Sequence, residues 1–171
     1  MIEMKVLQGY VENRTKEAAL AAMLIALFFV TRTYKVQVVP GFAGIDFSGA
    51  VIFTAASMLS WPYILIFTLA NIYNVSNIFL LAFVFSGSQV VFFLSKSVGE
   101  KWAPHIPAFG QIGGLPLYLF LMHVTGLIDF RVYLAVCAVP LAIYISTNYV
   151  GGLLIWKVVK GFGIIGEVET A

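Results

Sequence analysis

The side chains that could recognise a small molecule gather at a few places in an otherwise apolar chain. One patch, residues 71–77, reads Asn-Ile-Tyr-Asn-Val-Ser-Asn, a second lies around residues 123–133, and isolated polar residues interrupt apolar segments. Amide, imidazole and phenol groups donate and accept hydrogen bonds, so they suit a small polar ligand. The candidate ligand-binding residues are Asn71, Tyr73, Asn74, Asn77, Gln89, His123, Asp129, Arg131, Tyr144 and Asn148.

Motifs for catalysis or metal binding are missing from the sequence. It contains no His-Glu-x-x-His, no Gly-x-Ser-x-Gly and no phosphate-binding loop. The topology derived below places the two histidines, His105 and His123, on opposite sides, which argues against a shared metal site. Cys137 is the only cysteine, so neither an internal disulfide nor a cysteine-based metal cluster is possible. We expect no catalytic residue, no bound metal and no cofactor.

Composition indicates an integral membrane protein. The chain has 171 residues, of which 61% are hydrophobic and 11% are charged, whereas soluble domains are about half apolar and a quarter charged. We expect one membrane domain over residues 1–171. Net charge is only +2 and no basic stripe is present, so nucleic acid is not an expected partner. The polar start of the chain leads into an apolar run without a recognisable cleavage site, so we expect a retained first span.

The apolar segments predict an all-α bundle of six transmembrane helices. Thr15 is the expected cap of the first helix, residues 32–46 are expected to form a loop, and Pro140 should kink the last helix. The second and third helices are about 13 residues each, or about 20 Å, against a bilayer core of about 30 Å. One longer helix kinked at Pro62 is the alternative. The predicted spans are Glu17–Thr31, Phe47–Leu59, Pro62–Tyr73, Asn77–Ser95, Gln111–Leu127 and Val132–Trp156.

The distribution of Lys and Arg favours six spans with both termini in the cytoplasm. Six spans place seven basic residues inside and three outside, whereas five spans place four inside and six outside. Cytoplasmic loops carry the excess of positive charge, so six spans fit better. Residues 71–77 and the turn near Asp129 then lie on the outer side. The inner set in the six-span arrangement is Lys5, Arg14, Lys16, Lys96, Lys101, Lys157 and Lys160, and the outer set is Arg32, Lys35 and Arg131.

An alanine stripe marks the first predicted helix. Ala18, Ala22 and Ala26 recur every four residues and so share one face. Small residues at this spacing let a second helix approach closely in a membrane. The stripe could pack within this chain or dock a separate protein, and the sequence leaves both possibilities open.

The polar candidates also have structural interpretations. Gln89 and Asn148 could form hydrogen bonds between helices, since buried amides in lipid need partners. The patch at residues 71–77 could be a plain surface turn. Asp129 and Arg131 could simply pair with each other. These alternatives stay open from the sequence alone.

The combined pattern resembles the substrate-binding S component of energy-coupling-factor transporters. The matching features cover nearly the whole chain: its size, six spans with a short second and third, a polar N-terminus, and the stripe Ala18-xxx-Ala22-xxx-Ala26. The resemblance implies a multi-pass protein of the cell membrane that captures a water-soluble vitamin or related small molecule at the outer face. It also implies docking through the alanine stripe onto a transmembrane coupling subunit, with two ATPase subunits supplying energy.

In that family the first loop, the turn between spans 3 and 4, and the outer ends of spans 4 to 6 line the ligand site. This region contains the ten candidate ligand-binding residues given above. Two other functions stay open. One is a small intramembrane enzyme acting on a lipid or isoprenoid, for which only Glu100, Lys101 and His105 could serve. The other is a structural membrane module that assembles a larger complex.

Overall fold

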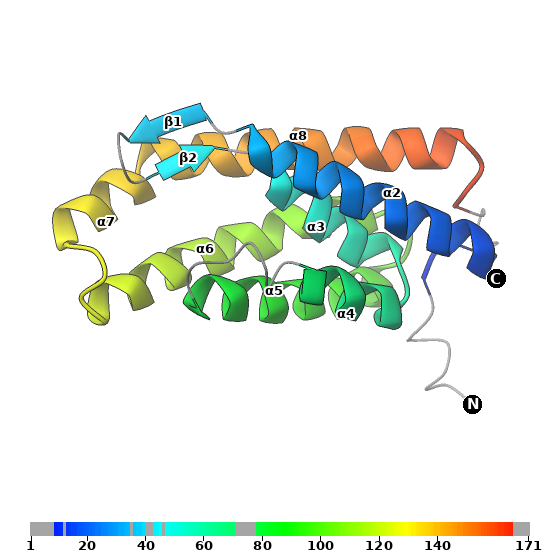
Figure 1. The fold of residues 1–171 in the computed structure, drawn as a ribbon, viewed down its shortest axis with the longest axis horizontal. Coiled ribbons are helices and arrows are strands. Elements are labelled where there is room, and N and C mark those ends of the chain that lie inside the picture. Colours follow the sequence, from blue (N-terminus) through cyan, green and yellow to red (C-terminus); the bar gives the residue numbers. More distant parts are fainter. Residues whose placement is uncertain are drawn as a thin grey trace.

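The computed structural model describes residues 9–11, 13–34, 36–39, 43–45, 47–70 and 78–165. Seven α-helices dominate this part of the chain (Figure 1). They are α2 (Arg14–Thr33), α3 (Ser48–Met58), α4 (Trp61–Ala70), α5 (Ile78–Val98), α6 (Ile106–Val124), α7 (Phe130–Cys137) and α8 (Val139–Gly161). A 3-10 turn, η2 (Ala103–His105), precedes α6, and a two-stranded hairpin, β1 (Val36–Val39) and β2 (Ala43–Ile45), follows α2. The predicted α-helical class is therefore confirmed, apart from this hairpin.

The hairpin replaces part of the loop predicted at residues 32–46. Its antiparallel strands pair Val36 with Ile45 and Gln37 with Gly44. The turn residues of this segment were recognised in the sequence, but the strand tendency of Val-Gln-Val-Val was not. The valines of β1 favour extended backbone, and this strand pairs with Ala43–Ile45.

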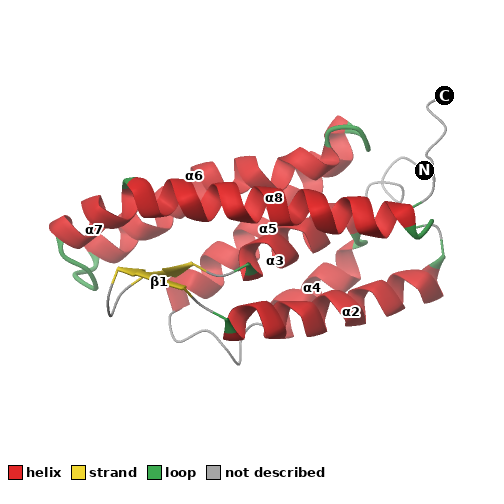
Figure 2. Cartoon of the chain, turned by 90° about the horizontal axis from the view of Figure 1, so that it is seen from above, coloured by secondary structure: helices red, strands yellow, loops and turns green. Residues whose placement is uncertain are grey.

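Helix α3 is the centre of the bundle. Every residue from 49 to 58 is buried, and α3 contacts α2, α5 and α8. Figure 2 shows α3 between α8 on one side and α2 on the other. Its sequence, Ser-Gly-Ala-Val-Ile-Phe-Thr-Ala-Ala-Ser-Met, is rich in small residues, which lets neighbouring helices approach closely.

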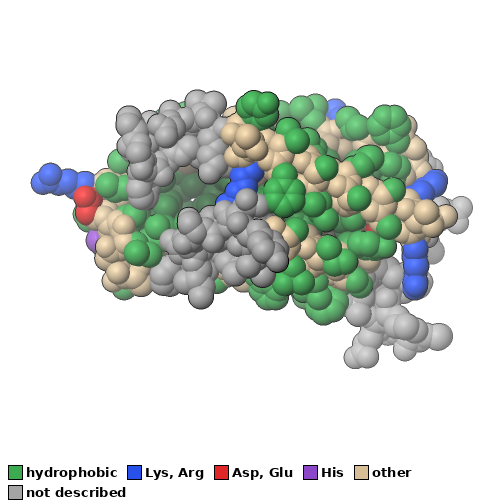
Figure 3. Space-filling model, viewed as in Figure 1, with side chains coloured by type: hydrophobic (Ala, Val, Ile, Leu, Met, Phe, Trp, Pro, Cys, Tyr) green, Lys and Arg blue, Asp and Glu red, His purple; other side chains and the backbone are tan. Residues whose placement is uncertain are grey.

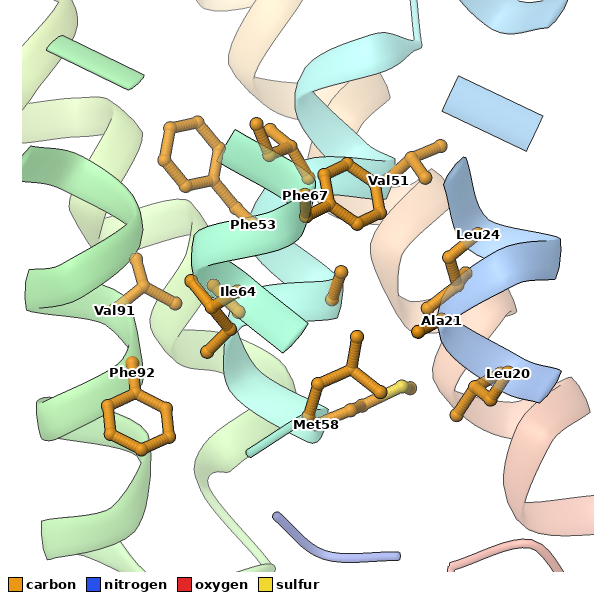
Figure 4. Packing of buried hydrophobic residues seen from close by; sticks show 14 of the residues in the cluster. Leu20, Ala21, Leu24, Val51, Phe53, Met58, Ile64, Phe67, Val91 and Phe92 are labelled. Carbon is orange, nitrogen blue, oxygen red and sulfur yellow. The ribbon is translucent and has the colours of Figure 1, made fainter. Parts of the chain in front are cut away.

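The main hydrophobic core surrounds α3 (Figure 4). Leu20, Leu24 and Phe28 of α2 are each at most 3% exposed. Phe28 also meets Phe67 of α4, with the ring centroids 5.6 Å apart. Phe92 of α5 is fully buried and belongs to the same core. Close packing of this kind fixes the relative positions of the helices.

The chain reverses direction at Leu59 and Ser60. Leu59 has extended backbone with ψ 161°, which ends α3. Ser60 bonds to Glu17 near the start of α2, whereas Phe67 meets Phe28, three turns further along α2. Helix α4 therefore runs parallel to α2 and antiparallel to α3. The alternative of one long kinked helix is wrong.

Two ends of the bundle can be told apart. At the basal end, Val11 bridges Ile165, and the Lys160 ammonium lies 2.6 Å from the Glu100 carboxylate. The turn at Ser60 lies at the same end. The hairpin and α7 lie at the opposite, distal end (Figure 1). The connections that the structure describes lie at the ends predicted for them, and Val11 and Ile165 both lie at the basal end. The connection at residues 71–77 lies outside the described residues.

Three helix boundaries differ from prediction. Asn13, not Thr15, caps α2, because the Asn13 side chain accepts a hydrogen bond from the Thr15 amide at 2.8 Å. Helix α6 begins at residue 106 instead of 111, since a proline fits the first turn of a helix. The predicted sixth span is two helices, α7 and α8. Pro140 has no N–H with which to continue a helix. One helix therefore ends at Cys137 and the next begins at Val139, in place of the predicted kink.

Length and hydropathy single out one helix of the described residues, Val139–Gly161, as able to cross a membrane. Ser48–Met58, Trp61–Ala70 and Ala82–Val98 are apolar but shorter. At 1.5 Å per residue, α3 is only about 16 Å long. The bundle thus has the predicted short second and third helices, whereas six complete membrane spans stay a prediction.

Candidate functional site

An aromatic row bridges three helices: Phe53 of α3 meets Phe83 of α5 at 6.0 Å between centroids, and Phe83 stacks on Tyr118 of α6 at 5.7 Å. Such rings provide apolar contact area, and a tyrosine adds one polar atom.

Tyr144 and Asn148 lie together where α8 crosses the start of α3. The Asn148 side-chain oxygen accepts a hydrogen bond from the Ala50 amide at 2.5 Å, and its nitrogen donates to the Tyr144 carbonyl at 2.8 Å. Asn148 is only 1% exposed. The first amides of a helix lack partners within the helix, so Asn148 supplies one from a neighbouring helix. This contact matches the interhelical interpretation of Asn148.

Gly49 is required for that contact. A Cβ at this position would lie 2.5 Å from the Tyr144 hydroxyl and 3.0 Å from the Asn148 side-chain oxygen. Both distances are shorter than normal van der Waals contact. The absence of a side chain at Gly49 therefore lets α8 bring two of the predicted polar residues directly onto α3.

Gln89 lies elsewhere. Its side-chain oxygen accepts a hydrogen bond from the Trp61 indole at 2.9 Å, while its amide nitrogen is buried without a partner in the described residues. Trp61 begins α4 at the basal end, whereas Asn148 bonds near the opposite end of α3. The structure therefore does not bring Gln89 together with Tyr144 and Asn148.

His123, Asp129 and Arg131 lie around the distal turn between α6 and α7. His123 lies 3.2 Å from the Ile128 carbonyl through Nδ1 and stacks beside the Tyr133 ring, with the centroids 6.0 Å apart. The Asp129 carboxylate caps α7 by accepting from the Val132 amide at 2.8 Å. Arg131 is exposed. Asp129 and Arg131 are both described, and no ion pair joins them.

The remaining predicted ligand residues, Asn71, Tyr73, Asn74 and Asn77, lie outside the described residues. Their role in lining the ligand site therefore stays a prediction. Of the ten candidates, the structure brings Tyr144 together with Asn148 and groups His123, Asp129 and Arg131 at the distal turn.

Two buried polar residues whose side chains have no hydrogen-bond partner in the described residues were not predicted. Gln111 of α6 is 1% exposed, and neither atom of its amide has a hydrogen-bond partner within the described residues. The same holds for the hydroxyl of Thr54 on α3. An unpaired buried polar group costs about 1–3 kcal/mol. A glutamine at the edge of an apolar segment was the available signal for Gln111, which was predicted only as the first residue of the span Gln111–Leu127.

A polar cluster joins several elements at the basal end. Glu17 is 4% exposed and accepts a hydrogen bond from the Ser60 amide at 2.5 Å. Lys96 donates to the Ser57 carbonyl at 3.2 Å, and its ammonium lies 3.8 Å from the centre of the Tyr10 ring. The sequence did not predict this bond between Glu17 and the Ser60 turn.

Tyr10 completes this cluster. Its amide donates to the Met58 carbonyl at 2.8 Å, and its hydroxyl donates to the Ser95 carbonyl at 2.7 Å. Burial, together with the negative charge of Glu100, raises the pKa of Tyr10 to about 12. The segment before α2 is therefore tied to both the end of α3 and the end of α5.

Two of the three residues that an intramembrane enzyme would need, Glu100 and His105, are engaged in structural contacts. Glu100 pairs with Lys160, and His105 Nδ1 lies 2.7 Å from the Tyr149 hydroxyl. Lys101 is exposed. Among the residues that the structure describes, no three His, Cys, Asp or Glu side chains are grouped so as to hold a metal ion.

The alanine stripe faces outward. Ala18, Ala22 and Ala26 are exposed, whereas the face of α2 that packs on the bundle consists of Glu17, Leu20, Ala21, Leu24 and Phe28. The stripe therefore does not serve packing within the described part of this chain.

Comparison of the chain with protein-family models, curated proteins and solved structures found no significant match.

Proposed function

We propose that this protein is a membrane-embedded substrate-binding subunit of an ATP-driven importer, similar to the S components of energy-coupling-factor transporters. Its substrate is a water-soluble vitamin or a related small molecule, captured at the distal end. It docks on a transmembrane coupling subunit that works with two ATPases.

The observation that carries the proposal is the apolar outer surface of the helices. Phe109 and Leu154 are about 60% exposed, at 63% and 59%, and Figure 3 shows hydrophobic side chains spread over the visible face of the bundle. Exposed apolar surface of this extent marks a membrane or protein contact. The exposed large side chains include Met23, Leu27 and Val30 on α2, Phe85, Val90 and Phe93 on α5, Ile112, Leu117 and Phe120 on α6, and Ile143, Val150 and Val158 on α8.

The interior of the bundle supports a membrane setting as well. Glu17 is the only Asp, Glu, Lys or Arg among the fully buried described residues, and it lies at the basal end, where the chain would meet water. A charge in the middle of a bilayer is costly, so this placement fits a bundle whose ends lie at the two membrane surfaces. The cell membrane is therefore the proposed location.

The outward alanine stripe is the proposed docking surface. Ala18, Ala22 and Ala26 expose a smooth face that a second transmembrane helix can approach closely. Their buried neighbours on α2 hold this face in place against the bundle. The sequence has no phosphate-binding loop, so the energy for transport must come from a partner.

Ligand capture is tested on protein purified without added ligand. Mass spectrometry of the extracted small molecules, followed by thermal shifts across a panel of vitamins, should identify a compound that raises the melting temperature. Empty protein in every preparation, with no shift across the panel, would sink the ligand-binding proposal.

Docking is tested by Ala22→Leu. We expect loss of association with the coupling subunit and retained ligand binding. The matched control is Ala142→Leu, which changes an exposed alanine on α8 and should leave association intact. Equal association of wild type and Ala22→Leu would contradict the docking role of the stripe.

A further inference from the structure

The basal end joins the last turns of α8 to the connection between α5 and α6. The Lys160 ammonium lies 2.6 Å from the Glu100 carboxylate. Further back along α8, the Tyr149 hydroxyl lies 2.7 Å from His105 Nδ1, and η2 contacts α8. Residues 100–105 therefore run alongside α8 between Tyr149 and Lys160.

Lys157 lies on the side of α8 that meets this connection. It precedes Lys160 by three residues and follows Tyr149 by two steps of four, so the three side chains share one side of the helix. The other two both contact the connection, which places Lys157 beside it. The connection itself carries Lys101 and Trp102, and these two side chains and Lys157 are all exposed.

This surface has more described basic side chains than described carboxylates. Among the residues that the structure describes, the carboxylates at the basal end are Glu17, which is buried, and Glu100, which pairs with Lys160. No ion pair in the same part of the chain involves Lys101 or Lys157. The remaining glutamates of the sequence lie outside the described residues: Glu3, Glu12, Glu167 and Glu169. Two positive charges therefore face outward beside a neutralised pair.

Apolar side chains border the two lysines. Trp102, Leu154 and Phe162 are each more than half exposed, and Leu154 lies one helical turn before Lys157. Tryptophan is enriched where lipid headgroups meet the hydrocarbon of a membrane. A phospholipid presents a phosphate next to acyl chains, so it matches a border of positive and apolar groups. A soluble anion has no use for the apolar part.

We propose that Lys101, Trp102 and Lys157 form a basal lipid surface that binds the headgroup of an anionic phospholipid. The two ammonium groups attract the negative headgroup, and the Trp102 ring lies at the level where the headgroup meets the acyl chains. The predicted spans end at Ser95 and Trp156, so this surface lies where the chain leaves the hydrocarbon. The inference rests on the proposed membrane setting, but not on transport or on the nature of the transported molecule.

Quenching of tryptophan fluorescence by brominated lipids tests the basal lipid surface. The whole chain is placed in nanodiscs that contain phosphatidylcholine and phosphatidylglycerol, and either one lipid or the other carries bromine on its acyl chains. Bromine quenches a tryptophan that it contacts. The contribution of Trp102 is the difference between wild type and Trp102→Phe, because Trp61 and Trp156 are common to both proteins.

We expect brominated phosphatidylglycerol to quench Trp102 more strongly than brominated phosphatidylcholine does, and salt to weaken this preference by screening. Removal of one lysine near an anionic membrane lowers affinity about fivefold, so Lys101→Gln and Lys157→Gln should each reduce the preference by about that factor. The matched control is Arg131→Gln, an exposed basic residue at the distal end, which should leave it unchanged. If Lys157 only complements the negative end of the α8 dipole, Lys157→Gln lowers stability and leaves the lipid preference as it was.

Equal quenching by the two brominated lipids would overturn the proposal, and so would a preference that neither lysine variant changes. Phosphate ions should weaken the preference no more than chloride does at the same ionic strength. A larger effect of phosphate would assign the lysines to a soluble anion and overturn the lipid assignment. Quenching of Trp102 by neither lipid would instead contradict the membrane setting itself, so failure of this inference and failure of the proposed function are distinguishable.

Discussion

Replacing Asn148 with alanine tests how α8 holds the central helix. Asn148 is 1% exposed and accepts the hydrogen bond of the Ala50 amide. Asn148→Ala leaves that amide buried without a partner, which costs about 1–3 kcal/mol. A loss of 1.4 kcal/mol lowers the folding equilibrium constant about tenfold. We therefore expect a clear decrease in the free energy of unfolding, with the helical content of the native state retained.

The assay is reversible denaturation of the detergent-solubilised protein, followed by circular dichroism. Thr147→Ala is the matched control, because the Thr147 hydroxyl bonds only within its own helix, to Ile143 and Tyr144. Such a substitution should change stability by no more than about 0.5 kcal/mol. If Asn148→Ala destabilises the protein no more than Thr147→Ala does, the Asn148–Ala50 bond does not hold α3 in place.

Three other predictions concern packing and ionisation. Gly152→Ala would place a Cβ 2.7 Å from the Thr54 hydroxyl, so it should cost about 1–3 kcal/mol, whereas Gly161→Ala, with open space around it, should not lower the melting temperature. Gln111→Met removes an unpaired buried amide and should raise the melting temperature; a lower value would show that the amide has a partner. Burial keeps the Tyr10 phenol neutral and raises its pKa to about 12. Its stabilising contribution is therefore complete below pH 10 and lost between pH 10 and 12. The stability difference between wild type and Tyr10→Phe should close over that range, and a constant difference would refute the assignment.

Helix positions were predictable because apolar runs and prolines determine them locally. The predicted spans Phe47–Leu59 and Pro62–Tyr73 leave a break between them, and the structure has a turn at Ser60 in that place. The number of helices near Pro140 was not predictable, since a proline in an apolar run can either kink a helix or end it. The hairpin was missed because a four-residue strand gives a weak periodic signal.

The polar residues were harder to interpret, because their partners lie far away in sequence. The sequence identified Asn148 as an amide that needs a partner, but not Ala50 as that partner. The spacing of Ala18, Ala22 and Ala26 placed them on one face, but spacing alone cannot tell whether that face turns inward. The sequence could not show that the Gln111 amide is unpaired, because this depends on which residues surround it in the fold.

The Asn148–Ala50 bond also has a consequence for biosynthesis. The two residues are 98 positions apart, and synthesis proceeds from the N-terminus, so α3 is made long before α8 exists. During that interval the start of α3 lacks the amide that later covers it, although α2 and α5 are already available. The nascent protein therefore stays incomplete at its centre until the last helix arrives. A chain that stops short of α8 leaves the start of α3 without the side chain that accepts the hydrogen bond of the Ala50 amide.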